Sequence, residues 1–533
     1  MESKTETLQE ETIEVGRSPF EQILHKTEFE DLKQAPEGQK FIDHVSKCRK
    51  TDPKKSKVSD YINLLKRVEN SLKMIEGAIM LRKVLKLYKI EEIVIQKILD
   101  SGAVPLIISH AKTAKELVLR VELVWCLSNM TAGNNTQISD LVKIGLIDLF
   151  LEILKEDDLL LASQALWGVN NISYLDVTYR DKFLAGGAIG LILGLHDKLV
   201  GLRPSEGVSL AGENVYVCQM IESISNLFRF SPLPSGPKIK QIFPKFSNLL
   251  LKMTETSDLT SEWDFRVIFY CVITFSKIVA HKEDNEDFGE LIHNLDLTKP
   301  ILDLLNQQIT HPNTRMFQSA CLKILGAFTL ISNESCQKIV DLGGLEVFTT
   351  LLHSKIKKTR REVGWILSNI AVGTKPQIQS ILNNKPLLRR LMTMSTEDED
   401  DVRLEAIWTI CNLTLRSSEQ QLYFLLRENF MELCLNVLSA NIGKKILGVV
   451  LESICTVMKR LDGFGGGSCV EGEANPLVDK IVRIGMDGVV EGLTLHEDYT
   501  VRKNAEYVLG RCRGSEDGFG LGASFEDDLR HLL

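Results

Sequence analysis

The sequence predicts an all-α protein made of about ten three-helix repeats. Two observations carry this prediction. A helical stretch in which Trp is followed four residues later by Asn occurs four times, and glycine-broken pairs of apolar segments precede such stretches. Neighbouring intact copies lie 42 or 43 residues apart, a period typical of helical repeats that stack in one dimension.

The Trp–Asn pattern is clearest at Val363–Ile370, whose sequence is VGWILSNI. Trp365 and Asn369 are four residues apart in a helix-forming run, so both side chains leave the same face of the helix. Ile366 and Ile370 leave from another face, where they can be buried. The pattern returns in VWCLSNM with Trp125 and Asn129, in LWGVNNI with Trp167 and Asn171, and in IWTICNL with Trp408 and Asn412.

Two shorter apolar segments joined by glycine form the other part of a repeat, as in LVKIGLIDLFLEIL around Gly145 and IVDLGGLEVFTTLL around Gly343. Glycine can adopt the left-handed backbone conformation that a tight joint between helices requires. Three helices in a period near 42 residues indicate an α-solenoid of the armadillo or HEAT type. The glycine joint favours an armadillo-repeat, right-handed superhelical solenoid, in which every third helix lines one concave surface.

The pattern is degraded between Trp167 and Trp365. The third helices expected there carry Glu222 with Asn226, Ile273 with Lys277, and Lys323 with Ala327, at steps of 55, 51 and 50 residues. These longer steps indicate insertions. One of them, Leu199–Asn214, falls between a second and a third helix, where a loop can lengthen without disturbing the stack. Two more repeats are expected after Asn412.

Changes in composition divide the chain into three segments. Residues 1–58 are polar, and we expect a mostly disordered tail with a possible helix across Phe41–Cys48. Residues 59–512 are expected to form the solenoid. Residues 513–533 are Gly-rich and acidic, which predicts a flexible C-terminal tail.

The composition also excludes several classes of function. A net charge of −8 argues against nucleic-acid binding, and no apolar run is long enough to span a membrane. The polar start MESKTETLQEE is not a secretory signal, and eleven cysteines without a C-x-x-C motif are expected to be buried thiols in a reducing compartment, cytosolic or nuclear. Since GFGGGSC lacks the remainder of a phosphate-binding loop and no catalytic constellation occurs, we expect no enzyme, catalytic residue, metal or cofactor.

The repeated Trp and Asn residues predict a peptide-binding surface. Asn can both donate to and accept from the backbone of an extended peptide. Trp rings can form slots for Lys or Arg, at roughly 0.5–2 kcal/mol per contact. Glu362 and Glu405 each precede a Trp by three residues, and Asp176 follows the second Trp–Asn helix, so acidic groups would favour basic peptides. Were these pairs core instead, each unpartnered Asn would cost roughly 1–3 kcal/mol.

From about Tyr61 to Arg511 the chain resembles the importin-alpha (karyopherin-alpha) family, in the SNI and SNL ends of its third helices and in the phrase SNLFRFSPLPSGP. The resemblance implies an armadillo adaptor that shuttles between cytoplasm and nucleus, binds basic nuclear localisation signals, joins importin-beta, and meets an exportin at its C-terminal repeats. It implies a major peptide site at Trp125, Asn129, Gly133, Trp167, Asn171, Asp176 and Asn226. It implies a minor site at Glu362, Trp365, Asn369, Glu405, Trp408 and Asn412.

The chain departs from the family pattern mainly in the major site. Glu222 occupies the position of its third Trp, Leu175 that of an Asp that clamps a lysine, and Ile138 that of a Thr. Asp176, one residue further on, is a candidate substitute for the missing Asp. The importin-beta-binding segment is not recognisable in residues 1–58, where the basic cluster Lys47–Lys57 is either a remnant of its autoinhibitory part or a solvated lead-in to the first helix.

Three hypotheses therefore stay open. The chain is an import adaptor, an armadillo-repeat scaffold that binds other extended peptides without an import role, or an importin-alpha relative that binds cargo mainly through the minor site.

Overall fold

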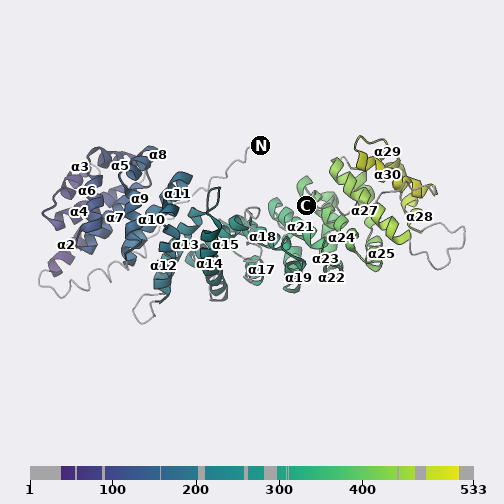
Figure 1. Cartoon of the computed structure of the whole chain (residues 1–533), viewed down its shortest axis with the longest axis horizontal. Helices are drawn as coiled ribbons and strands as arrows, with labels where there is room; N and C mark the ends of the chain where they lie inside the picture. Colours follow the sequence, from purple (N-terminus) through teal and green to yellow (C-terminus); the bar gives the residue numbers. More distant parts are fainter. Residues whose placement is uncertain are drawn as a thin grey trace. The chain divides into compact units, whose positions relative to one another are not determined.

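The computed structural model describes residues 38–54, 57–86, 91–156, 158–201, 210–256, 262–280, 297–307, 309, 311–440, 443–462 and 476–514. Within these ranges the secondary structure is helical and contains no strand (Figure 1). The chain divides into two compact units, Met1–His281 and Lys282–Leu533. Helices in each unit follow the three-helix repeat that the sequence predicts, so the predicted all-α repeat fold is confirmed.

In the first unit, α4, α7, α10, α13 and α15 are the third helices of successive repeats, and each packs against the next. The bounds of the helices are α2 Gly38–Lys50, α3 Val58–Leu65, α4 Ser71–Leu85, α5 Glu91–Asp100, α6 Val104–Thr113, α7 Leu117–Met130, α8 Asn135–Lys143, α9 Leu146–Ile153, α10 Leu159–Leu175, α11 Val177–Ala185, α12 Ala188–Gly201, α13 Leu210–Leu227, α14 Gly236–Thr256 and α15 Glu262–Ala280. Most of the insertion Leu199–Asn214 lies outside the described residues.

In the second unit, the third helices are α18, α21, α24, α27 and α30, and they pack successively in the same way. The bounds of the helices are α17 Thr298–Asn306, α18 Thr314–Thr329, α19 Asn333–Asp341, α20 Gly344–Leu351, α21 Lys357–Ala371, α22 Lys375–Asn383, α23 Lys385–Glu397, α24 Asp400–Arg416, α25 Glu419–Arg427, α26 Phe430–Leu438, α27 Lys444–Asp462, α28 Pro476–Arg483, α29 Met486–Leu493 and α30 Tyr499–Cys512.

The third helices bury most of their circumference because each lies between two others and against the second helix of its own repeat. In α7, for example, apolar residues face α4, α6 and α10, so the helix shows no single apolar stripe. What remains accessible on such a helix is a narrow face. Trp167 and Trp365 emerge on this face, whereas Trp125 and Asn412 of the repeated pattern are buried.

Two local features position the shorter helices: a glycine joint within a repeat and a glutamine hydrogen bond between neighbouring repeats. Gly145 and Gly343 have φ angles of 103° and 81°, as expected for the glycine joint. Gln377, a buried side chain, closes a capping box at the start of α22 and donates from Nε2 to the Asn333 carbonyl of α19 at 2.6 Å. Gln137 and Gln421 make the same bond from α8 to Glu92 and from α25 to Lys375, so a row of glutamines sets the register between repeats.

The helix expected across Phe41–Cys48 is present as α2, which packs against α4. Arg49, from the basic cluster Lys47–Lys57, forms an ion pair with Glu122 of α7 at 2.9 Å. This part of the cluster is therefore docked on the first repeats. Residues 1–37 and residues 515–533 of the two expected tails lie outside the described residues.

Other expectations concern cysteines, metals and membranes. The ten described cysteines are free thiols, and all except Cys512 are buried; burial raises the pKa of Cys126 to about 12. The described residues contain no group of His, Cys, Asp and Glu side chains able to hold a metal ion. No single helix among them is long and apolar enough to cross a membrane, and only the pair Glu92–Asp100 and Val104–Thr113, bent by 86°, reaches that criterion together.

Candidate peptide-binding site

The Asn side chains of the repeated pattern form a ladder within each unit. Asn171 donates from Nδ2 to Thr131 Oγ1, and Asn369 donates to Thr329 Oγ1, both at 2.9 Å. In each case the acceptor belongs to the preceding third helix or its C-cap. The remaining members make equivalent bonds: Asn129 to the Arg82 carbonyl at 3.3 Å, Asn226 to Asn170 Oδ1 at 3.3 Å, and Asn412 to the Ser368 carbonyl at 3.2 Å.

This arrangement fixes each carboxamide by one N–H, but Asn412 is buried and is less accessible than Asn171 and Asn369. No hydrogen bond within the described part of the chain engages the Oδ1 atom of Asn171 or Asn369, and both side chains are half-buried. A carboxamide held in this way can accept from a peptide N–H and can donate its second N–H to a peptide carbonyl. The ladder therefore has the chemistry needed to bind an extended backbone.

In the second unit, Trp365 presents a large open surface. Its side chain is 37% exposed, and the ring rests on Gly326 of α18. A Cβ atom at Gly326 would lie 2.2 Å from Cζ3 of the ring, so only glycine leaves room for the indole. Trp408 on the next third helix is half-buried. Glycine at 326 was not among the residues expected to matter, because its role depends on a neighbour 39 positions away in sequence.

We expect Gly326→Ala to weaken peptide binding more than it weakens folding. The added methyl group displaces the Trp365 ring from its binding position. Because the ring is open to solvent, it can move outward, so the cost to folding should be smaller than the roughly 1–3 kcal/mol expected when a methyl group is forced against a fully enclosed side chain. Peptide titration and thermal unfolding of the same variant measure the two effects. Gly448→Ala is the matched control, since a Cβ atom at that helical position meets nothing within 4 Å. A variant that melts early but binds normally would contradict the expectation.

Two carboxylates stand beside the Trp residues of the second unit. Glu362 is 9% exposed; Ser319 Oγ donates to its Oε1 atom at 2.7 Å, and its buried Oε2 atom has no hydrogen-bond partner among the described residues. Burial raises the pKa of Glu362, against the opposing effects of the Ser319 bond and of nearby cations that include Lys358 and Lys323. Burial likewise raises the pKa of the half-buried Glu405. Both groups lack a strong cationic partner of their own.

The first unit differs at Trp125, which is 7% exposed. The guanidinium of Arg82, in α4, lies 3.9 Å from the centre of its ring, and the ammonium of Lys86, the C-cap of α4, lies 4.6 Å from it. The chain's own cations therefore cover the ring face that the sequence assigned to a peptide lysine. Trp167, on the next third helix, is 39% exposed and offers an open ring.

Glu222, at the position of the third Trp, adds no free charge. Its carboxylate accepts from Tyr270 Oη at 2.6 Å and pairs with Arg266 at 3.1 Å, both on α15. The neighbouring Asn226 is half-buried and belongs to the ladder.

The residues around the clamp position have structural roles. Leu175 is exposed, and Asp176 caps α11 by accepting from the Thr178 N–H at 2.7 Å. Hydrogen bonding from the Thr178 side chain, and then from its N–H, lowers the pKa of Asp176. Gly133 packs against Gln137 and Ile95, where a Cβ atom would clash, and Ile138 is buried. Asp176 stays exposed, so its carboxylate retains one oxygen for a ligand.

Comparison with known proteins agrees with this architecture. Residues 332–372 match the Armadillo/beta-catenin-like repeat family. The chain is 23% identical to importin subunit alpha-1a of Oryza sativa subsp. japonica over 70% of its own length and 64% of the relative's length, so it spans about two thirds of that protein. It is 22% identical to importin subunit alpha-9 of Arabidopsis thaliana, covering 80% of this chain and 77% of that protein.

Solved structures show the same fold at lower identity. The crystal structure of an engineered protein matches with a TM-score of 0.61 at 17% identity, covering 86% of this chain and 98% of that one. A structure titled for a phosphorylation switch in the interaction between cadherin and beta-catenin matches with a TM-score of 0.59 at 12% identity, covering 86% and 91%. The predicted armadillo-repeat fold is thus confirmed.

Proposed function

We propose that this chain, a divergent relative of the importin-alpha subunits, is an import adaptor that binds basic nuclear localisation signals as extended peptides and links them to importin-beta. Its main peptide site is the ladder of the second unit, formed by Trp365, Asn369, Trp408 and Asn412 with the carboxylates of Glu362 and Glu405. Trp167 and Asn171 form a smaller site in the first unit. The adaptor shuttles between cytoplasm and nucleus in this proposal.

One contrast supports this assignment most strongly. The Trp365 ring is open, is seated on a glycine, and has a carboxylate with an unpaired oxygen three residues before it. Trp125 occupies the same position in its repeat, but its ring is covered by Arg82, and its preceding carboxylate, Glu122, is paired with Arg82 at 2.6 Å. An external lysine can gain a cation–π contact and the electrostatic attraction of an unpaired carboxylate at Trp365, whereas both partners are already engaged at Trp125.

Titration of the full chain with a labelled Lys-Lys-Lys-Arg-Lys peptide tests the proposal. The expected result is saturable binding that weakens as salt is added, because exposed charge pairs are screened. A peptide with glutamine at the basic positions is the control and should bind far more weakly. Equal binding of both peptides would favour the armadillo scaffold for other peptides, and no binding of either would exclude a basic-signal adaptor.

Recruitment of importin-beta needs a separate experiment. A pull-down with the full chain and with residues 1–37 removed asks whether the N-terminal segment carries the contact. The deletion ends before α2, because α2 packs against α4 and supplies Arg49 to the ion pair with Glu122. Retained peptide binding with no capture of importin-beta by either form would contradict the adaptor role.

Binding is also expected to depend on pH. The pKa values of Glu362 and Glu405 are raised by burial, so these carboxyl groups take up protons at a higher pH than the ordinary value of 4.5. Ionised carboxylates attract the basic peptide, so affinity should fall as pH falls, beginning above pH 4.5. Peptide titrations across pH at constant ionic strength measure this. The double variant Glu362→Gln and Glu405→Gln should bind more weakly with a flatter profile, and an unchanged profile would contradict the assignment.

A further inference from the structure

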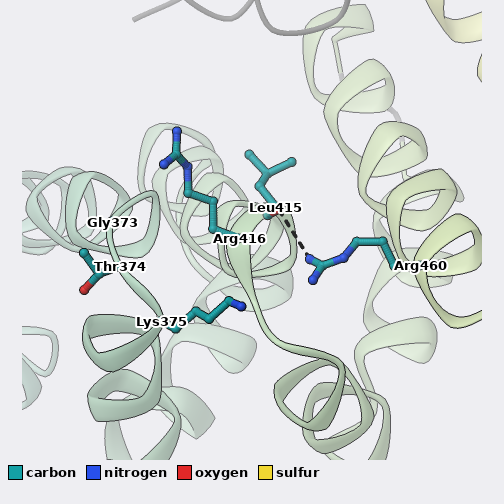
Figure 2. A pocket seen from close by; sticks show the side chains of 6 residues that line it. All are labelled: Gly373, Thr374, Lys375, Leu415, Arg416 and Arg460. Carbon is teal, nitrogen blue, oxygen red and sulfur yellow. Dashed lines mark hydrogen bonds between the residues drawn. The ribbon is translucent and has the colours of Figure 1, made fainter. Parts of the chain in front are cut away.

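A basic pocket lies at one end of the second unit's ladder. Its volume is about 350 Å³, and it is lined by Gly373, Thr374, Lys375, Leu415, Arg416 and Arg460 (Figure 2). Lys375 and Arg460 extend toward each other from opposite sides, whereas the Arg416 side chain starts between them at the end of α24 and extends upward in this view, away from both. Three cationic residues and no acidic residue line this space.

The pocket belongs to the same helix faces as the ladder. Arg416 lies four residues after Asn412, which lies four after Trp408, so the three side chains share one stripe of α24. Gly373 follows Asn369 by four residues in the same way, and Arg460 comes from α27, which packs against α24. Arg416 and Arg460 therefore lie near the C-terminal ends of α24 and α27, and Lys375 follows the C-terminal end of α21 as the first residue of α22.

The carboxylates stand at the other end. Glu405 precedes Trp408 by three residues, and Glu362 precedes Trp365 by the same step. A peptide that crosses these helices along the ladder thus has acidic groups on one side and Lys375, Arg416 and Arg460 on the other. An extended chain directs alternate side chains to opposite sides. The two edges of the ladder therefore carry opposite charge.

Of the three cations, Arg460 is held in place, by backbone carbonyl groups and not by a carboxylate. Arg460 donates to the carbonyl oxygens of Thr414 at 3.3 Å and Leu415 at 3.4 Å, and to that of Ser417, which fixes its guanidinium against the end of α24. Lys375 and Arg416 are exposed. No ion pair within the described ranges joins any of the three to a carboxylate. Lys375 also opens α22, whose N-terminal N–H groups add partial positive charge.

We propose that this pocket binds an anionic side chain, a carboxylate or a phosphate, of the same extended peptide whose basic residues occupy the slots at Trp365 and Trp408. This inference rests on the proposed function and adds a specificity to it. The preferred signal carries its anionic residue an odd number of positions from a bound lysine, because only those side chains face the basic edge. Phosphorylation of a serine at that position would strengthen binding.

A peptide series with the full-length protein tests this inference. One basic peptide is prepared with serine, phosphoserine, aspartate or glutamine placed at successive positions around the basic residues. At positions of one parity, phosphoserine and aspartate should bind about threefold to tenfold tighter than serine and glutamine, with phosphoserine the stronger. At positions an even number of residues from a bound lysine, the anionic residue should not increase the affinity. Equal affinities of all four peptides at every position would overturn the inference.

Protein variants then locate the effect. The double variant Lys375→Gln and Arg416→Gln should lose the preference for phosphoserine while it still binds the serine peptide. Lys385→Gln is a matched control, because Lys385 is also exposed, is the first residue of a helix and is followed by proline, but does not line the pocket. A preference that survives the double variant, or is lost equally in Lys385→Gln, would overturn the inference.

The two proposals fail in different ways. If the chain binds no basic peptide of any composition, the proposed function fails. If it binds the serine peptide with the dependence on Trp365 expected below but never prefers an anion, only the basic pocket is wrongly assigned.

Discussion

Replacing Trp365 by alanine should weaken binding of a basic peptide by about 2 kcal/mol, or about thirtyfold, while the free energy of unfolding changes much less. The ring is 37% exposed and rests on one face against Gly326, so its truncation removes a binding surface more than a core contact. A bound lysine would lose both the cation–π contact and the apolar surface for its stem. Peptide titration and chemical unfolding of the same variant give the two quantities.

Trp125→Ala is the internal comparison, with the opposite expected outcome. Trp125 is buried under Arg82 and Lys86, so its loss should destabilise the first unit by about 3–5 kcal/mol and leave peptide affinity of the folded protein nearly unchanged. Trp167→Ala should reduce only the contribution of the smaller site. If Trp125→Ala and Trp365→Ala weakened the peptide equally, the proposed distinction between the two units would be wrong.

The repeat architecture could be predicted from sequence because its determinants are local. A Trp and an Asn four residues apart indicate one face of a helix, and a glycine before an apolar segment indicates a joint between two helices. Gly145 and Gly343 adopt the left-handed conformation as expected, although Asn429 takes the same conformation, with φ of 66°, in a repeat that lacks the glycine. Asparagine is the usual alternative to glycine in that region.

The state of each Trp slot could not be predicted, because it depends on the neighbouring repeat. Arg82 reaches the Trp125 ring from a helix some 40 positions earlier, and Glu122 holds it there. Glu222 places a carboxylate at a Trp position, yet Arg266 of α15 pairs with that charge and Tyr270 donates a hydrogen bond to it. In contrast, the continuation of the stripe from Asn412 to Arg416 was present in the sequence. Only the packing of α27 beside α24 brings Arg460 to it and makes a pocket.

Glu122→Ala should destabilise the first unit by about 3–5 kcal/mol, because it leaves two arginines without their buried counter-ion. Glu122 is fully buried and pairs with Arg82 at 2.6 Å and Arg49 at 2.9 Å. Glu156→Ala is the control. Its ion pair with Arg120 at 2.7 Å is partly exposed, and such pairs contribute about 0–1 kcal/mol. Urea unfolding of both variants measures the difference, and equal losses would show that desolvation cancels the buried attraction.

The same carboxylate gives a dependence on pH whose sign is fixed. Burial alone would raise the pKa of Glu122, but the attraction and hydrogen bonds of Arg82 and Arg49 outweigh it and hold the pKa below the ordinary value of 4.5. A lowered pKa stabilises the folded state above the unfolded value, and this stabilisation is lost as pH falls through the folded value. The wild-type protein should therefore lose stability in acid more steeply than Glu122→Ala. Arg82 also lies over the Trp125 ring, so protonation of Glu122 should let Arg82 move and expose that ring to water. The expected signal is a red shift of tryptophan emission in acid that is absent in the Trp125→Phe variant.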